Sequence, residues 1–455
     1  MHRRSFLSMA GPVLLGRWTP RFASLRYLLT GARWYANGTW QSGNLGIDSS
    51  GRLRLVPPGS LADSVIEVTG RVVSPGFVDI LADNSSGQGW RTFETYKVSD
   101  GVTTALQMHG GSAQCGAFYQ RAGTERHLVN HGVSTFVMAI RARYALVEER
   151  LRRVERNLAE GALGVSHSLE YQPVPHHEML AYAKLARRWD RPLFLHLRYS
   201  SPERELDGVR EAIRLAEESG ARVHIAHLHS TGGTWHMAEA LELLRAANAR
   251  GLVITTCVYP YSYWATYLGS RRFDPGWRER YGLDYRDLRI VGTGERLTAA
   301  SFAEYRTRNP LVAVPEGTMP LDRTYDLAIA EDFCGVGSDG GIQFEGRANS
   351  HPRGAGCFAS AIRRAIETGM PLERILEKLT AFPSRIVRTG LQTRGVIEDG
   401  AIADLTVFDP AAVRSTATLE EPNRFSSGIE LVFVNGELAY RPGQLCGSNG
   451  RAVRA

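Results

Sequence analysis

Short apolar segments alternate with amphipathic segments through the middle of the chain, between residues 76 and 338. Segments 145–160 and 237–250, for example, place apolar residues at helical spacing after apolar runs of strand length. Repeated strand–helix units predict parallel strands joined by right-handed crossovers. We therefore expect an α/β fold, a (β/α)8 TIM barrel, and not a doubly wound open sheet, whose glycine-rich turn after the first strand is missing. The predicted strands are 76–81, 103–108, 134–140, 164–169, 192–197, 223–228, 252–258 and 334–338.

The two ends of the chain have a different pattern, with short β-like runs separated by turns. Residues 25–73 and 395–445 share it, so we expect them to build one small β-sandwich domain together. The barrel then spans residues 74–394, and residues 446–455 form a tail. Residues 264–319 break the strand–helix rhythm and predict an insertion that lies over the barrel mouth as a lid.

Residues 1–24 carry a twin arginine, Arg3 and Arg4, followed closely by Phe6 and Leu7 and a short apolar run. This leader resembles a bacterial twin-arginine signal peptide. A functional leader predicts export to the periplasm, and a non-functional one predicts a cytoplasmic protein. No other stretch is long and apolar enough to span a membrane, so no membrane partner is expected.

The net charge of +7 comes from 54 basic and 47 acidic residues among 455. Nearly all the basic residues are arginines, which are spread along predicted helices; the lysines are Lys97, Lys184 and Lys378. Because no nucleic-acid motif accompanies them, we expect solvated helix faces and a small anionic substrate, with no nucleic-acid partner. The oligomeric state stays open.

Two of the predicted strands end close to a histidine. His196 closes one, and His227 closes the next, one strand–helix–strand repeat later. Because the carboxyl ends of parallel strands lie on the same rim, the two imidazoles should be neighbours. A lone histidine is most simply a hydrogen-bonded polar residue at a strand end, whereas a pair one repeat apart favours metal ligands.

Other polar residues follow further strands at the same rim, namely Asp83, His109, Glu170 and Asp339. A metal-assisted hydrolase needs neutral imidazoles that hold a Lewis-acidic ion and a carboxylate that accepts a proton from water. Asp339, after the last strand, is the candidate for that carboxylate. Its alternative role is that of an ordinary turn residue between glycines.

Several stretches together resemble the metal-dependent amidohydrolase superfamily and, within it, the N-acyl-D-amino-acid deacylase (D-aminoacylase) branch. The resemblance covers about residues 25 to 440, and it rests on segments 74–79, 101–104, 161–173, 259–261, 337–340, 351–353 and 394–435. It implies hydrolysis of the amide bond of an N-acyl-D-amino acid, or of a similar small amide, at a zinc site.

The resemblance also implies roles for individual residues. His196 and His227 take the two histidine ligand positions, and Asp339 takes the position of the proton-shuttling carboxylate. The clamp for the substrate carboxylate would be Arg353 with Tyr259 or Tyr261, since a guanidinium binds a carboxylate through two parallel hydrogen bonds. His229 faces the same side of its strand as His227 and is a further candidate substrate contact.

The chain departs from the family pattern at the metal site. The family's first strand ends in His-x-His, where this chain has Leu81 and Asp83, and Gly110 stands at the position of the family's cysteine. We expect His109 to replace that thiolate and complete a three-histidine site with an open water position. Asp83 and Glu170 are additional candidate ligands. Because no lysine lies at a predicted strand end, a carboxylated-lysine bridge is excluded and one zinc ion at most is expected.

These losses leave a second function open. A divergent barrel could have lost amide hydrolysis and perform a metal-free lyase, isomerase or cyclisation step, or only bind a ligand. A purely structural scaffold is a third class, which the polar strand ends disfavour.

Overall fold

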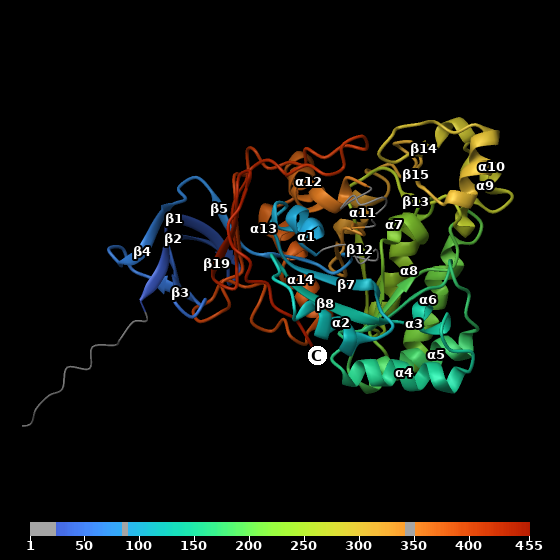
Figure 1. The fold of residues 1–455 in the computed structure, drawn as a ribbon, viewed down its shortest axis with the longest axis horizontal. Coiled ribbons are helices and arrows are strands. Elements are labelled where there is room, and N and C mark those ends of the chain that lie inside the picture. Colours follow the sequence, from blue (N-terminus) through green and yellow to red (C-terminus); the bar gives the residue numbers. More distant parts are fainter. Residues whose placement is uncertain (1–23, 84–89, 342–350) are drawn as a thin grey trace, which may run out of the picture.

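The computed structural model describes residues 24–83, 90–341 and 351–455. The predicted leader lies almost entirely outside them. Figure 1 shows a sheet domain beside a barrel that is surrounded by helices, with strands from the N-terminal part and the C-terminal part of the chain together in the sheet domain. No helix in the described ranges could cross a membrane.

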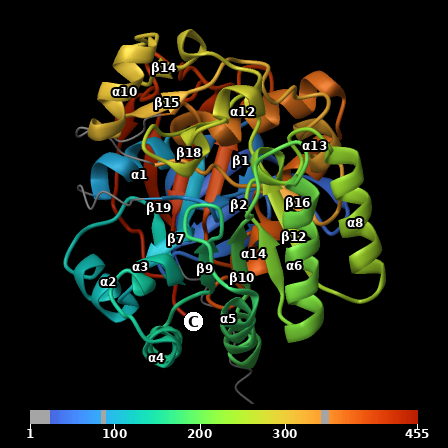
Figure 2. The ribbon, with the colours of Figure 1, turned by 90° about the vertical axis from the view of Figure 1, so that its right-hand side faces the viewer.

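The barrel has eight parallel strands that pair in the order in which they occur along the chain. A backbone bridge between Ala82 and Gly340 connects the first strand's end to the last and nearly closes the ring. The predicted (β/α)8 barrel is thus confirmed (Figure 2). Its strands are β6 (Phe77–Asp79), β7 (Val102–Ser112), β8 (Asn130–Phe136), β9 (Val165–Ser168), β10 (Leu193–His196), β11 (Val223–Ile225), β12 (Ile254–Val258) and β16 (Cys334–Val336).

One predicted strand, 134–140, was wrong in its second half. β8 starts earlier, at Asn130, and ends at Phe136, where helix α3 (Val137–Arg141) begins. The apolar run continues into this helix because Val137 and Ile140, three positions apart, are buried on one of its faces.

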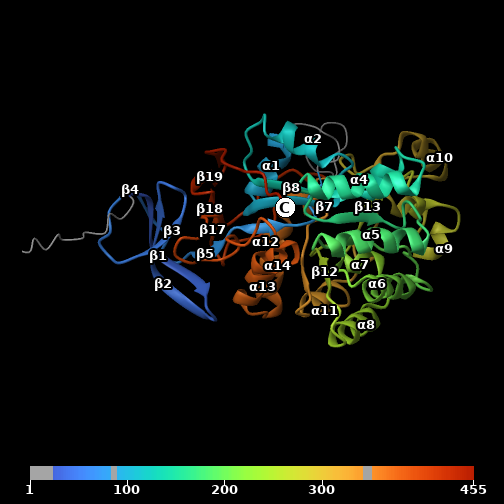
Figure 3. The ribbon, with the colours of Figure 1, turned by 90° about the horizontal axis from the view of Figure 1, so that it is seen from below.

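Helices cover the outside of the barrel, as Figure 3 shows for α4, α5, α6 and α8. In α6, the residues Val209, Ile213 and Ala216 form the buried stripe, and Gly220 ends the helix in the left-handed region at φ +67°. The helices are α1 (Trp90–Val98), α2 (Cys115–Ala122), α4 (Val147–Ala159), α5 (His176–Arg188), α6 (Glu205–Ser219), α7 (Leu228–Thr231), α8 (Met237–Ala249), α11 (Tyr325–Ile329), α12 (Arg353–Thr368), α13 (Leu372–Leu379) and α14 (Ala381–Val387).

Both chain ends contribute to the small domain, as predicted. Its strands belong to one nine-stranded sheet, in which β5 from the N-terminal part pairs antiparallel with β17 from the C-terminal part. It has its own core, which includes Leu29, Val73 and Phe433. The strands are β1 (Leu25–Ala36), β2 (Thr39–Asp48), β3 (Leu53–Val56), β4 (Ala62–Glu67), β5 (Val72–Pro75), β17 (Leu405–Phe408), β18 (Ile429–Val434), β19 (Glu437–Arg441) and β20 (Gln444–Leu445).

The insertion folds as a separate small sheet with its own aromatic packing. Phe302 stacks on Trp277 with ring centroids 5.3 Å apart. In Figure 1 the insertion lies at the end of the barrel farthest from the sheet domain. Its elements are β13 (Ala265–Tyr267), a 3-10 turn (Arg271–Phe273), α9 (Trp277–Tyr281), a second 3-10 turn (Tyr285–Asp287), β14 (Arg289–Ile290), α10 (Ala299–Arg308) and β15 (Leu311–Ala313).

The C-terminal tail is tied to the barrel. The Gly450 amide donates to the His127 carbonyl at 2.8 Å, and the Val453 amide donates to the His131 carbonyl at 2.7 Å. The Val453 side chain is buried in the barrel core. The last residues therefore fasten the start of β8.

Candidate metal centre

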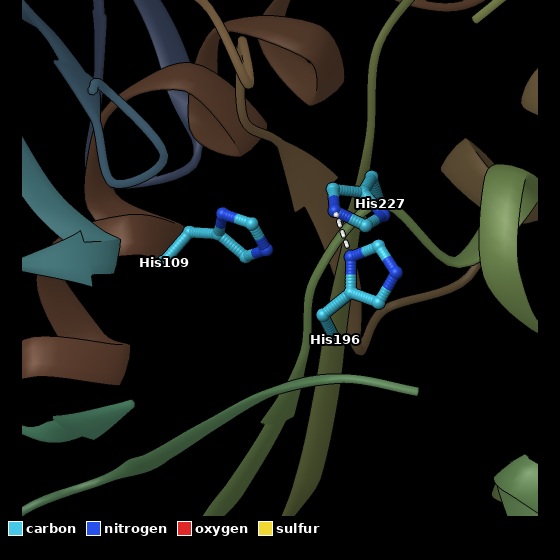
Figure 4. A group of neighbouring side chains, drawn as sticks. All are labelled: His109, His196 and His227. Atoms are coloured by element: carbon cyan, nitrogen blue, oxygen red, sulfur yellow. Dashed lines mark hydrogen bonds between the residues drawn. The ribbon is translucent and has the colours of Figure 1, made fainter. Parts of the chain in front are cut away.

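Three histidines, of which His196 and His227 are buried and His109 is partly buried, converge at the carboxyl ends of barrel strands. His109 lies near the end of β7, His196 is the last residue of β10, and His227 follows β11 in a left-handed turn at φ +33°. Their ligand atoms all lie within 4.8 Å of one another. Figure 4 shows His109 facing the other two imidazoles across a common centre. The structure therefore brings together the three residues that we predicted as metal ligands.

Outer partners determine which ring nitrogens face this centre. His196 Nε2 lies 2.8 Å from the carboxylate of Glu170, and His227 Nδ1 lies 3.0 Å from the Ser230 hydroxyl. That hydroxyl also lies 3.1 Å from the His227 carbonyl, and in the arrangement in which it donates to this carbonyl it accepts from His227 Nδ1. The protons on these outer nitrogens leave the inner ones, His196 Nδ1 and His227 Nε2, with lone pairs.

The facing lone pairs fit a cation. His196 Nδ1 and His227 Nε2, joined by the dashed line in Figure 4, are 3.3 Å apart; with both ring protons on the outer nitrogens, these two atoms are acceptors and cannot hydrogen-bond to each other. Two nitrogens bound at roughly 2.0–2.1 Å to a tetrahedral zinc ion would lie about 3.3 Å apart. His109 Nε2 is buried and has no hydrogen-bond partner among the described residues. The donor set therefore fits one zinc ion with an open fourth position.

Burial keeps the imidazoles of His109 and His227 neutral, as metal ligands must be. It lowers the pKa of His109 to about 4, against the opposing effect of the nearby Asp339 carboxylate. It also holds the pKa of His227 well below its ordinary value, with His196 and His109 acting in the same direction. Protons therefore compete weakly for these two nitrogens near neutral pH.

Asp339 lies beside the histidines and is held by an arginine. It follows β16 in the left-handed region at φ +49°, and its Oδ1 is 3.9 Å from His109 Nδ1. Arg353 contacts Asp339 in two ways: its Nη2 lies 2.8 Å from Asp339 Oδ2, and its Nε donates to the Asp339 backbone carbonyl at 2.8 Å. The carboxylate thus has a fixed direction toward the centre.

A cavity of about 830 Å³ opens onto the three histidines and Asp339. Asp83 and Tyr259 line it on the barrel side, and Trp264, Thr266 and Arg272 of the insertion line it on another side. The insertion therefore forms part of the cavity wall.

Not every predicted site residue reaches this cavity. Tyr259 and Arg353 line it, but Tyr261 does not, and the Tyr261 hydroxyl faces Ser360 Oγ at 3.5 Å. His229 is buried against the Tyr259 ring, with centroids 4.1 Å apart. Asp83 lines the cavity outside the three-histidine group.

Glu170 stands behind the metal centre. Its Oε2 accepts from His196, from Ser200 Oγ at 3.0 Å and from Arg272 Nε at 3.1 Å. Burial alone would raise the pKa of Glu170, but the Arg272 charge and the hydrogen bonds from His196 and Ser200 outweigh it and lower that pKa to about 2. Arg272 was not predicted as a site residue, because nothing in the sequence distinguishes it from the other arginines of the insertion.

A second group of residues of types that bind metals lies at the amino-terminal end of β8 and consists of Glu94, His127 and His131. His127 uses both ring nitrogens within the protein: Nδ1 lies 2.6 Å from Glu94, and Nε2 donates to the Ala122 carbonyl at 2.9 Å. We therefore interpret Glu94 and His127 as an internal ion pair that stabilises the fold.

Comparisons with known proteins agree with this geometry. A profile of the "Amidohydrolase family" matches residues 95–439. The N-acyl-D-glutamate deacylase of Alcaligenes xylosoxydans xylosoxydans is 27% identical over 451 residues, which cover 84% of this chain and 88% of that protein. The D-aminoacylase of the same organism is 27% identical over 463 residues, covering 88% and 92%.

Solved structures show the same fold. An N-acyl-D-glutamate deacylase from Bordetella bronchiseptica, complexed with zinc and a phosphonate inhibitor, superposes with a TM-score of 0.81 at 22% identity, covering 95% of this chain and all of that chain. A D-aminoacylase described as having a binuclear metal centre gives a TM-score of 0.80 at 22% identity, covering 94% and 99%.

Proposed function

The chain belongs to the amidohydrolase family, and on this premise we propose that it hydrolyses the amide bond of an N-acyl-D-amino acid or a closely similar small amide. The observation that carries the proposal is the convergence of three imidazoles beside an oriented carboxylate, at the rim where barrel enzymes hold their active sites. The deacylase relatives favour hydrolysis over the alternative of a metal-free reaction or simple ligand binding.

His109, His196 and His227 would hold one zinc ion. Two of the family's other ligand positions are lost here, since Leu81 is fully buried in the apolar core and Gly110 has no side chain, while Asp83 lines the cavity. Lys97 is bonded to Asp79 and Ser338, at 2.8 Å and 2.9 Å, and serves as no bridging ligand. When bound, zinc would act as a Lewis acid that polarises the amide carbonyl.

Asp339 would move the protons of the reaction. Its carboxylate faces the cavity beside His109 and can accept a proton from the attacking water, then deliver it to the departing amine nitrogen. Arg353 keeps that carboxylate in place through its two contacts.

The substrate is proposed to be a small anion. Arg353 and Tyr259 line the cavity close to the centre and remain our candidates for binding its carboxylate. Arg121 and Arg143 are exposed at the cavity rim and add positive charge there. Export of the enzyme through its twin-arginine leader is a separate proposal.

A panel of N-acetyl-D-amino acids, with the L-enantiomers as matched controls, tests the function directly. We expect release of free amino acid from D-substrates and a much lower rate with L-substrates, with activity lost on removal of metal. No hydrolysis of any acyl amino acid by protein containing zinc would contradict the proposal.

A further inference from the structure

Arg272 is buried deep in the site although it belongs to the insertion. Only 3% of its side chain is exposed. Besides Glu170, its Nη2 donates to Ser200 Oγ at 3.0 Å and to the Ser230 carbonyl at 2.8 Å. The guanidinium also lies over the Trp264 ring, 4.7 Å from its centroid. These contacts fix the arginine inside the site, where it lines the cavity, and leave it no role as a surface charge.

The contacts of Arg272 lead to a metal ligand through Glu170. Arg272 and His196 both donate to the same carboxylate oxygen, Oε2 of Glu170. A carboxylate held in this way can only accept from His196 Nε2, which places the ring proton there and directs Nδ1 to the centre. Glu170 cannot turn away without leaving the Arg272 charge buried and unpaired.

We infer that Arg272 is a positioning residue for the metal centre, acting through Glu170 to fix the tautomer and ring direction of His196. The inference rests on the proposed zinc site. An arginine of the insertion would thus make the affinity for the metal depend on how the insertion docks onto the barrel.

Through these contacts, binding of the metal and docking of the insertion onto the barrel are coupled in both directions. If docking of the insertion orients His196, then a metal bound by His196 must stabilise docking by the same free energy. The insertion, residues 264–319, should therefore exchange its amide hydrogens more slowly when zinc is bound.

The test uses the full-length protein and zinc alone as the probe. Zinc affinity is measured by competition with a chromophoric chelator for the wild type, Arg272→Met and Glu170→Gln. The conservative Glu170→Gln keeps the shape of the side chain and serves if Arg272→Met does not fold. We expect both variants to bind zinc about 10–100-fold more weakly, and the double variant to be no weaker than the worse single one, because the two residues act as a unit.

Glu205→Gln is the matched control, since Glu205 is also a buried carboxylate and lies 2.9 Å from a histidine, His236, outside the three-histidine group. It should lower thermal stability and leave zinc affinity unchanged. Zinc should slow hydrogen exchange of the insertion in the wild type and not in Arg272→Met.

The outcomes separate the inference from the proposed function. Zinc binding by the wild type with unchanged affinity in both variants overturns the role of Arg272 and leaves the zinc site intact. Failure of the wild type to bind zinc overturns the zinc site and this inference with it. An equal loss of affinity in Glu205→Gln assigns the effect to general destabilisation and also overturns the inference.

Discussion

Replacing His109 tests whether this histidine has taken over the position of the family's thiolate. Its Nε2 is a buried nitrogen without a partner in the described structure, and it faces the two other imidazoles. Structural zinc sites with four protein ligands bind with roughly 10–16 kcal/mol, or about 3 kcal/mol for each ligand. At 1.4 kcal/mol for each factor of ten, His109→Ala should weaken zinc binding on the order of a hundredfold.

Isothermal titration with zinc, or competition with a chelator, measures this loss. His224→Ala is the matched control, because His224 is a buried histidine of β11 whose ring is hydrogen-bonded to Thr255 Oγ1 at 2.9 Å. The control should lose thermal stability and keep its zinc affinity. If His109→Ala binds zinc within twofold of the wild type, the three-histidine site is refuted.

Four further predictions concern the base, the lost thiolate, the rim and the sheet domain. Asp339→Asn should lower kcat by about 10²–10⁴-fold while zinc content stays at the wild-type level; unchanged kcat would remove Asp339 from the chemistry. Gly110→Cys should be tolerated, since an added Cβ would make an ordinary contact, 3.5 Å from Asp83 Oδ1. Chelator competition should show that this variant binds zinc more tightly through the new thiolate, and equal or weaker binding would contradict this. Arg121→Gln combined with Arg143→Gln should raise KM for anionic substrates more at low than at high salt, and a salt-independent effect would count against electrostatic capture. Asp48 accepts hydrogen bonds from Ser50 and Arg54, which outweigh the effect of its burial and lower its pKa, so its stabilising effect is present above its unfolded pKa and is lost as pH falls through the lower folded value. Asp48→Asn should therefore reduce the free energy of unfolding by about 2 kcal/mol at neutral pH and by much less below pH 3. Denaturant unfolding at both pH values would show this difference.

The barrel could be predicted from the sequence because each strand is a short apolar run with a clear end. Parallel strands that are buried on both sides lack the alternating pattern of surface strands, and their run length separates them from helices. The same logic failed at residues 137–140, where a short buried helix continues the apolar run of β8. A helix of one turn has too little sequence to display its period.

The centre could be predicted in part. His196 and His227 followed from one repeat of the barrel, since topology alone places consecutive strand ends side by side. Glu170 was predicted at the correct strand end, but only the structure shows that its oxygen faces the outer nitrogen of His196. Chain position determines which rim a residue joins, and side-chain direction decides whether it touches the ion or the ligand behind it.

Arg272 shows what the sequence could not reveal. It lies 102 residues from Glu170 along the chain, in a segment whose own fold gives no strand-to-helix rhythm to follow. Arg353 shows a related difficulty, because a guanidinium that could clamp a substrate carboxylate also pairs with a carboxylate of the protein, here Asp339. Residue type identifies the chemistry, and the partner is fixed only by the folded geometry.

Zinc titration of metal-free enzyme, with hydrolysis of an N-acetyl-D-amino acid as the readout, tests the central claim most directly. The protein stripped by chelator should be inactive, and activity should rise linearly with added zinc to a plateau at one equivalent. Full activity in the stripped protein, with zinc absent by elemental analysis, would contradict the account.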